Sequence, residues 1–223
     1  MIFSKEEKTS TLKINEIFFS IQGESSLAGW PTVFIRTTGC NMRCSYCDTK
    51  YSYYDGTKMS LQYIIKKVAS YKNVRHVCIT GGEPMAQPNS LLLMKELCDL
   101  EYVVSLETNG FYDTAAVDPR VIKVIDIKTP GSGESDSFNF KNLGTIKPQD
   151  QIKFVICSLE DYEWSKDLTH KYDLAKKCNV FFSPAFETMS NKTLAEKILE
   201  DSVPVRLQLQ LHKYIWNPQD RGV

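Results

Sequence analysis

Three cysteines stand close together in the stretch Thr38–Thr49, which reads TGCNMRCSYCDT. Cys40, Cys44 and Cys47 have the spacing C-x3-C-x2-C. Thiolates are the usual ligands of iron–sulfur clusters, and four of them normally hold a [4Fe–4S] unit. Three would leave one iron open to an outside group, and an open coordination position marks a catalytic metal. The spacing therefore favours a cluster whose unique iron binds a substrate or cofactor.

Two other interpretations of these cysteines stay open on spacing alone. One is a zinc site completed by a distant fourth ligand, and the other is a set of thiols that share a loop by chance. Zinc sites usually show paired C-x2-C or Cys/His elements, and no second pair occurs in this chain. The remaining cysteines are scattered singly, and Cys78 and Cys157 fall in apolar runs where we expect small core residues.

Length and composition predict a single globular domain over residues 1–223. The chain has 27 acidic and 27 basic residues, so its zero net charge gives no reason to expect nucleic acid or an anionic membrane as a partner. The N-terminus is polar, and no apolar run reaches the length of a membrane span. We therefore expect a cytoplasmic protein, in which clustered thiols more often bind metal than form disulfides.

Short β-rich runs alternate with helical patterns along the chain. This alternation predicts a mainly parallel sheet with helical crossovers, which is an α/β barrel or a partial barrel. A segment rich in Gly, Ser and Asn, Thr129–Lys147, is expected to be a long loop and a candidate lid. The expected strands are Leu12–Phe19, Thr32–Arg36, Arg75–Thr80, Tyr102–Glu107, Val121–Ile127, Gln151–Cys157, Val180–Ser183 and Val205–Leu211. The expected helices are Ser60–Tyr71, Ser90–Leu100, Leu159–Lys177 and Asn191–Asp201.

Unusual polar residues follow directly after five of these strands. In a parallel α/β sheet the carboxyl ends of the strands form one rim, where ligands bind. The sequence therefore predicts one composite site on that rim. Its parts are the cysteine loop, Thr80–Pro84, Thr108–Gly110, Lys128 and His212-Lys213.

The cysteine spacing, with Tyr46 before the last cysteine, resembles the signature of the radical S-adenosylmethionine (SAM) superfamily. Gly81-Gly82-Glu83-Pro84 is similar to the G-G-E-P motif of that superfamily, and its two glycines would let the backbone approach a ligand closely. The resemblance implies that SAM chelates the open iron. It also implies that the reduced cluster cleaves SAM to a 5′-deoxyadenosyl radical, which abstracts a substrate hydrogen.

Further motifs resemble the 7-carboxy-7-deazaguanine synthase family from about residue 13 to the end of the chain. They are Ser20–Glu24, Arg36, Cys47-Asp48-Thr49, and Gln210–Lys213 followed by Trp216-Asn217-Pro218. The resemblance implies a modified, incomplete (β/α) barrel that forms a homodimer. It implies a lyase that converts 6-carboxy-5,6,7,8-tetrahydropterin to 7-carboxy-7-deazaguanine and ammonia, on the route to queuosine-type deazapurines. The implied cofactors are a [4Fe–4S] cluster, SAM and Mg²⁺, with an electron donor such as flavodoxin or ferredoxin.

The resemblance also implies roles for single residues, although it assigns no acid or base. The expected SAM-binding residues are Tyr46, Gly82, Glu83, Asp126 and Lys128. The expected substrate-binding residues are Gln22, Gly23, Glu24, Arg36, Thr80, His212 and Pro218. An amide and a carboxylate suit the donor–acceptor edge of a pterin, and a forked guanidinium suits its carboxylate. The remaining implied role is that of Thr49, whose hydroxyl would bind Mg²⁺.

Three alternative functions compete with this hypothesis. A glycyl-radical activating enzyme shares the cysteine spacing and the short length, but it acts on a partner protein and does not need the motifs at Gln22–Glu24 and His212–Pro218. The non-catalytic alternatives are an electron-transfer iron–sulfur protein and a zinc-binding module.

Overall fold

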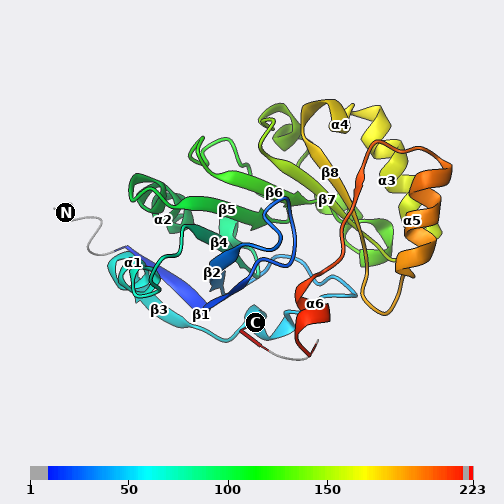
Figure 1. Cartoon of the computed structure of the whole chain (residues 1–223). Helices are drawn as coiled ribbons and strands as arrows, with labels where there is room; N and C mark the ends of the chain where they lie inside the picture. The colour runs from blue at the N-terminus through cyan, green and yellow to red at the C-terminus, as the bar shows by residue number, and fades with distance from the viewer. Residues whose placement is uncertain (1–9, 218–220, 223) are drawn as a thin grey trace.

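The computed structural model describes residues 10–217 and 221–222, and its centre is one nine-stranded sheet (Figure 1). The strands lie in the order β3-β1-β2-β4-β5-β6-β7-β8-β9. Their bounds are β1 Thr11–Ile21, β2 Pro31–Thr37, β3 Thr57–Ser60, β4 His76–Gly81, β5 Val103–Thr108, β6 Ile122–Asp126, β7 Gln151–Ile156, β8 Asn179–Pro184 and β9 Arg206–Leu207.

Every neighbouring pair from β2 to β9 is parallel, whereas β1 is antiparallel to both β2 and β3. The first and last strands of the order, β3 and β9, do not pair with each other, so the sheet stays open. This arrangement confirms the predicted α/β class and the incomplete barrel. It also puts the carboxyl ends of β2 and of β4 to β8 on one side, as a parallel sheet requires.

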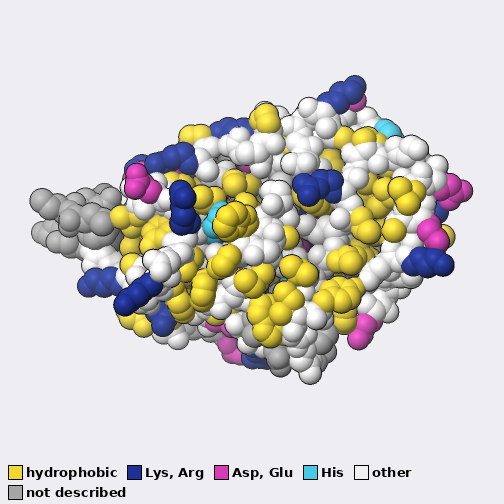
Figure 2. Space-filling view, in the orientation of Figure 1, with side chains coloured by type: hydrophobic (Ala, Val, Ile, Leu, Met, Phe, Trp, Pro, Cys, Tyr) yellow, Lys and Arg dark blue, Asp and Glu magenta, His cyan; other side chains and the backbone are white. Residues whose placement is uncertain are grey.

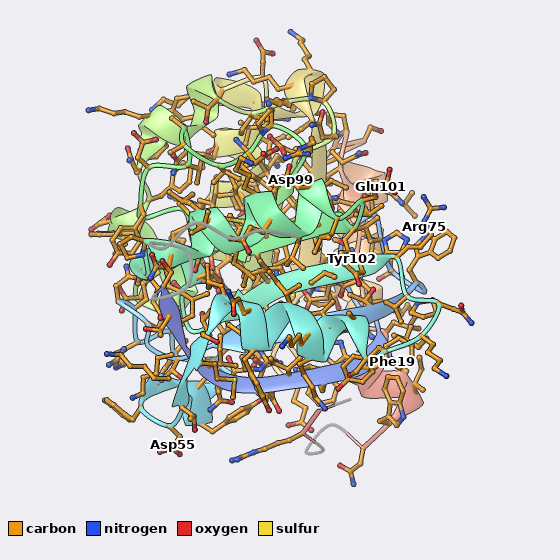
Figure 3. The ribbon with its side chains drawn as sticks, turned by 90° about the vertical axis from the view of Figure 1, so that its left-hand side faces the viewer. Phe19, Asp55, Arg75, Asp99, Glu101 and Tyr102 are labelled. Carbon is orange, nitrogen blue, oxygen red and sulfur yellow. The ribbon has the colours of Figure 1, made fainter. Side chains whose placement is uncertain are left out.

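Helices cover the outer side of the curved sheet. The α-helices are α1 Leu61–Ala69, α2 Asn89–Asp99, α3 Leu159–Lys171, α4 Leu174–Lys177, α5 Asn191–Glu200 and α6 His212–Ile215. Short 3-10 helices are η1 Lys50–Tyr53, η2 Pro84–Ala86, η3 Pro130–Ser132, η4 Ser135–Ser137 and η5 Phe140–Gly144. Figures 1 and 3 show α1 and α2 lying side by side over the half of the sheet that contains β1 and β5. None of the helices in the described ranges has the length and apolarity that crossing a bilayer requires.

The start and the buried face of α1 follow from its sequence. Ser60 caps the helix by accepting a hydrogen bond from the backbone N–H of Tyr63. The buried residues Leu61, Ile64 and Val68 recur at the spacing of one helix face. They pack into a core cluster beneath β1, β2, β4 and β5. A second cluster lies beneath β6, β7 and β8, so the two halves of the sheet have separate cores.

Three element predictions were wrong in detail. The strand β3 was not predicted, because Thr57-Lys58-Met59-Ser60 lies at a sheet edge and shows no buried alternation. The expected helix Leu159–Lys177 is two helices, since Asp173 takes a left-handed backbone conformation (φ 50°) between them. The expected strand Val205–Leu211 pairs only over Arg206–Leu207, after which the chain turns back toward the rim.

The segment Thr129–Lys147 is packed rather than free. It forms the three 3-10 helices η3, η4 and η5, and its side chains Phe138 and Leu143 are buried in the second core cluster. The buried Asn142 side chain accepts from the Thr114 backbone N–H and donates to the carbonyl oxygens of Gly110 and Tyr112. This segment is therefore tied to the core by packing and hydrogen bonds, and a role as a lid stays a prediction.

Phe138 gives a test of this packing. We expect Phe138→Ala to lower the free energy of unfolding by about 3 kcal/mol or more, because a buried phenylalanine is replaced by a cavity. Phe111→Ala is the matched control, since Phe111 is 45% exposed and should lose less than about 1 kcal/mol. Urea denaturation of the two variants makes the comparison. Equal losses would show that the loop does not contribute to the core.

Candidate active site

One cavity of about 520 Å³ opens at the carboxyl ends of the strands. Alternate residues of the strands face it, for example Phe34 and Arg36 of β2 and Lys153 and Val155 of β7. Nearly all the predicted site residues that the structure describes lie in its wall. They are Gln22, Gly23, Glu24, Arg36, Cys40, Cys44, Tyr46, Cys47, Thr49, Thr80, Gly82, Asp126, Lys128 and His212. Pro218 lies outside the described residues.

The three cysteines of the loop line one end of the cavity, and all three are free thiols. Burial raises the pKa of Cys40, and it raises the pKa of Cys44 to about 11. In the described part of the chain, no three His, Cys, Asp or Glu side chains converge on a point that would hold a single metal ion. Separate thiols around one cavity suit a multi-iron cluster, in which each iron takes its own thiolate. The residues present therefore fit a cluster with three protein ligands.

The cysteine loop is fixed by backbone contact with the Gly81-Gly82-Glu83-Pro84 turn. The Glu83 N–H donates to the carbonyl oxygen of Gly39 at 2.7 Å, and the Gly82 N–H donates to that of Thr37 at 3.1 Å. A Cβ atom on Gly82 would come 1.9 Å from the Gly39 oxygen. Glycine at this position therefore lets the two loops touch directly before Cys40 begins the cluster loop.

The carboxylate of Glu83 lies behind the cavity wall rather than in it. It accepts hydrogen bonds from the Thr108 hydroxyl at 2.7 Å, the Asn109 N–H at 2.7 Å and the Met85 N–H at 2.9 Å. Burial raises its pKa, and these donors oppose the shift. Glu83 thus holds Asn109 in place, and the Asn109 amide lies 4.0 Å from the Cys40 sulfur. A direct contact between Glu83 and SAM stays a prediction.

Next to the cysteines, Asp126 and Lys128 form an ion pair at 3.0 Å. The Lys128 ammonium lies 5.6 Å from the ring centroid of Tyr46. Burial opposes ionisation of Asp126, but Lys128 and Lys153 outweigh it and lower its pKa. Within the described residues, the Asp126 Oδ1 atom and the Tyr46 hydroxyl are buried without a hydrogen-bond partner. Buried unpartnered polar atoms in a cavity wall are suited to a polar ligand.

At the other end of the cavity, the turn Gln22–Glu24 contacts the C-terminal segment. The Leu211 N–H donates to the carbonyl oxygen of Gly23 at 2.9 Å, and the His212 ring packs so tightly that a Cβ on Gly23 would meet its Nδ1. The Glu24 carboxylate accepts from the Gln210 amide at 2.8 Å. Burial opposes ionisation of Glu24, but Lys153, His212 and Gln210 outweigh it and lower the pKa to about 2.

Arg36 lies at the end of β2 with its side chain 14% exposed. Its Nε donates to Glu16 at 2.7 Å, and its guanidinium lies over the rings of Phe18 at 5.6 Å and Tyr51 at 5.8 Å. Burial opposes its charge, but Tyr51 and Glu16 outweigh this and raise its pKa. Near the C-terminus, Arg221 packs on the same Tyr51 ring at 4.1 Å. Arg36 is therefore a buried, permanently charged group beside the cavity.

Several residues in or directly behind the cavity wall were not predicted from the sequence. Glu16 and Tyr51 surround Arg36, and the Glu107 carboxylate accepts from the Thr80 hydroxyl at 2.9 Å. Lys153 lies in β7 between the buried residues Ile152 and Phe154. A charged residue inside an apolar strand was the one signal available for it, because isolated lysines are rarely buried.

Similarity to known proteins agrees with this geometry. The radical SAM superfamily profile matches residues 34–126. A 7-carboxy-7-deazaguanine synthase from Chlorobaculum tepidum is 46% identical over 216 residues, covering 95% of this chain and 97% of the relative. A second, from Koribacter versatilis, is 42% identical over 226 residues, with 95% and 100% covered. The chain belongs to the 7-carboxy-7-deazaguanine synthase family of radical SAM enzymes.

The fold of this family member also occurs in solved structures. QueE from Escherichia coli has a TM-score of 0.76 at 22% identity, covering 95% of this chain and 100% of that one. Streptococcus suis SuiB bound to S-adenosylmethionine has a TM-score of 0.54 at 13% identity, with 77% and 48% covered. Membership of the superfamily implies a [4Fe–4S] cluster and SAM as cofactors. Because the similarity covers 95% of the chain, the alternatives of an activating enzyme, an electron-transfer protein and a zinc module are set aside.

The contact at Gly82 gives a test of how the cluster loop is held. Overpacking of this kind costs about 1–3 kcal/mol, so we expect Gly82→Ala to hold roughly tenfold less iron after anaerobic reconstitution. Gly144→Ala is the matched control, because a Cβ there would meet nothing within 4 Å. Iron and sulfide analysis of both variants measures the effect. Wild-type iron content in Gly82→Ala would contradict the proposed support of the loop.

Proposed function

We propose that this protein converts 6-carboxy-5,6,7,8-tetrahydropterin to 7-carboxy-7-deazaguanine with release of ammonia, a step toward queuosine-type deazapurines. The observation that carries the proposal is the single cavity that joins the three-cysteine loop to Gln22–Glu24, Arg36 and His212. The proposal is also supported by the 46% identity of this chain, over 95% of its length, with a 7-carboxy-7-deazaguanine synthase.

The substrate end of the cavity has the groups that a carboxylated pterin needs. The ionised Glu24 can accept hydrogen bonds from the N–H donors of the 2-amino-4-oxo edge, next to the amide of Gln22. The Arg36 guanidinium uses Nε for Glu16 and can offer its Nη groups to the substrate carboxylate. His212 and Thr80 would bind the ring between these two ends.

The cofactor end has the groups that a cluster and SAM need. Cys40, Cys44 and Cys47 would hold three irons of the [4Fe–4S] unit. That cluster, when bound with SAM, supplies the 5′-deoxyadenosyl radical that starts the reaction. The unpartnered Asp126 Oδ1 can accept a hydrogen bond from a SAM donor, while Lys128 offers a positive charge to the SAM carboxylate. Gly82 and Tyr46 would line the methionine part of SAM.

A product assay tests the proposed function. The reconstituted protein is incubated anaerobically with SAM, a strong chemical reductant and 6-carboxy-5,6,7,8-tetrahydropterin. We expect 7-carboxy-7-deazaguanine by mass spectrometry together with one ammonia per turnover. A triple Cys→Ala variant of the cluster loop is the control. Iron-loaded protein that cleaves SAM but yields no deazaguanine would overturn the proposal.

We also propose that Thr49 binds Mg²⁺ together with substrate oxygens and water. Its hydroxyl lines the cavity and lies 3.7 Å from the Cys47 sulfur, and η1 begins directly after it. The Thr49 side chain makes no capping hydrogen bond to that helix, and its oxygen keeps lone-pair capacity for a ligand beside its contact with the Cys47 sulfur. Mg²⁺ prefers oxygen ligands and keeps several waters, so one hydroxyl from the protein suits it.

Thr49 variants test the magnesium assignment. We expect Thr49→Ala to lose most of the activation of turnover by Mg²⁺, while Thr49→Ser keeps it because the oxygen is retained. The measurement is the product formation rate across a magnesium titration, with iron content as the control for intact cluster loading. An unchanged magnesium response in Thr49→Ala would remove Thr49 as a ligand.

A homodimer and a protein electron donor, such as flavodoxin or ferredoxin, complete the proposal. Figure 2 shows hydrophobic side chains gathered around α6, where Leu209, Leu211, Tyr214 and Ile215 are exposed. Exposed apolar groups that lie together often mark an interface with another protein. A monomer mass by light scattering would exclude the homodimer.

The proposed electron donors are tested separately. Turnover supported by a chemical reductant but by neither flavodoxin nor ferredoxin would exclude these donors.

A further inference from the structure

The buried lysine of β7, Lys153, links the two ends of the cavity. Its ammonium lies 2.6 Å from Glu24 Oε2 and 3.2 Å from Asp126 Oδ2. The side chains of Lys153, Glu24 and Asp126 are only 10%, 13% and 16% exposed. One ammonium therefore contacts a carboxylate proposed to bind substrate and a carboxylate proposed to bind SAM.

The contacts continue in both directions from Lys153. Asp126 Oδ2 also pairs with Lys128 at 3.0 Å, so negative and positive groups alternate along the cavity floor. At the other end, Glu24 Oε1 accepts from the Gln210 amide at 2.8 Å. Each oxygen of Glu24 thus has one fixed donor and keeps lone-pair capacity on the side that faces the cavity.

Two buried carboxylates need positive partners to stay ionised, because burial favours the neutral acid. The groups that face Glu24 are Lys153 from β7, Asp126 from β6, and Gln210 and His212 from the C-terminal segment. Among them, Lys153 combines a full positive charge with the shortest contact to Glu24. The carboxylates of Asp126 and Glu107 also help to keep the Lys153 ammonium protonated. Without Lys153, Glu24 would face Asp126 with its main counter-charge removed.

We propose that Lys153 is a positioning residue for substrate recognition, which holds Glu24 ionised and oriented toward the 2-amino-4-oxo edge of the pterin. This inference rests on the proposed function. An ionised carboxylate accepts from two neighbouring N–H donors, whereas a protonated one offers a donor of its own and loses that match. The substrate need not touch Lys153 for its affinity to depend on it.

The test uses equilibrium binding, so that no turnover is involved. Holoenzyme loaded with cluster and SAM, but without reductant, is titrated calorimetrically with 6-carboxy-5,6,7,8-tetrahydropterin between about pH 6 and pH 9. In the wild type the pKa of Glu24 is about 2, so the carboxylate contribution to Kd should not change over this range. In Lys153→Met burial should raise that pKa toward neutrality, because the ammonium is gone.

The expected signature is therefore a change in pH dependence. Lys153→Met should bind at least tenfold more weakly than wild type at the acid end, with about a tenfold effect for each pH unit below the raised pKa. The deficit should shrink as pH rises and Glu24 loses its proton. Lys192→Met is the matched control, since Lys192 on α5 is 83% exposed and should match wild type at every pH. A deficit in Lys153→Met that is absent, or constant with pH, overturns the inference.

Two further variants separate positioning from folding. Lys153→Arg keeps the charge, so its Kd should track the wild-type pH profile even if binding is weaker, and a new pH dependence would contradict the inference. In Glu24→Gln with Lys153→Met, the pH dependence should vanish because the titrating group is gone. Its persistence would assign the effect to another residue. Failure of the wild type to bind the tetrahydropterin would overturn the proposed function and this inference together.

Discussion

The parallel alignment of β2 and β4 to β8 is the constraint on which the rest of the site depends. The chain must cross back, most often through an outer helix, before each new parallel strand begins, so every parallel strand delivers its carboxyl end to the same rim. Three parts of the site meet at this rim although they are far apart in the chain. They are the cluster loop after β2, the glycine turn after β4 and Asp126 at the end of β6. The direct backbone contact between Gly82 and Gly39 shows how closely that alignment must hold, since the space for one methyl group is lacking.

Within that frame, charge rather than apolar packing shapes the floor of the cavity. Four charged side chains form a row of ion pairs across it, each about 3 Å from the next and largely shielded from solvent. In spatial order they are Glu24, Lys153, Asp126 and Lys128. Burying so many ions is costly unless each has a partner of opposite sign. Here each carboxylate has one, which keeps the groups ionised and limits the positions that they can adopt. A cavity built in this way is prepared for polar ligands before any ligand arrives.

The sequence was most informative where chemistry and spacing coincide. The cysteine loop, the glycine turn and the strand ends were predicted, because thiol spacing and period-two apolar runs are local signals. The partners of those groups were not predicted. Glu16 lies 20 residues from Arg36, and Gln210 lies 186 residues from Glu24, so only the folded chain shows that they touch. The edge strand β3 and the break at Asp173 were missed for a related reason, since tertiary pairing and one left-handed residue decide them.

The C-terminal segment folds back onto Gln22–Glu24 and completes one end of the cavity. The superfamily profile ends at residue 126, which covers the cysteine loop and the glycine turn but neither Gln22–Glu24 nor Gln210–His212. The matched segment contains the three cysteines, whereas Gln22–Glu24 and Gln210–His212 flank it in the chain and meet in space through the Leu211 N–H and the Gln210 amide. One end of the cavity is therefore built by two segments that lie far apart in the chain and outside the superfamily profile.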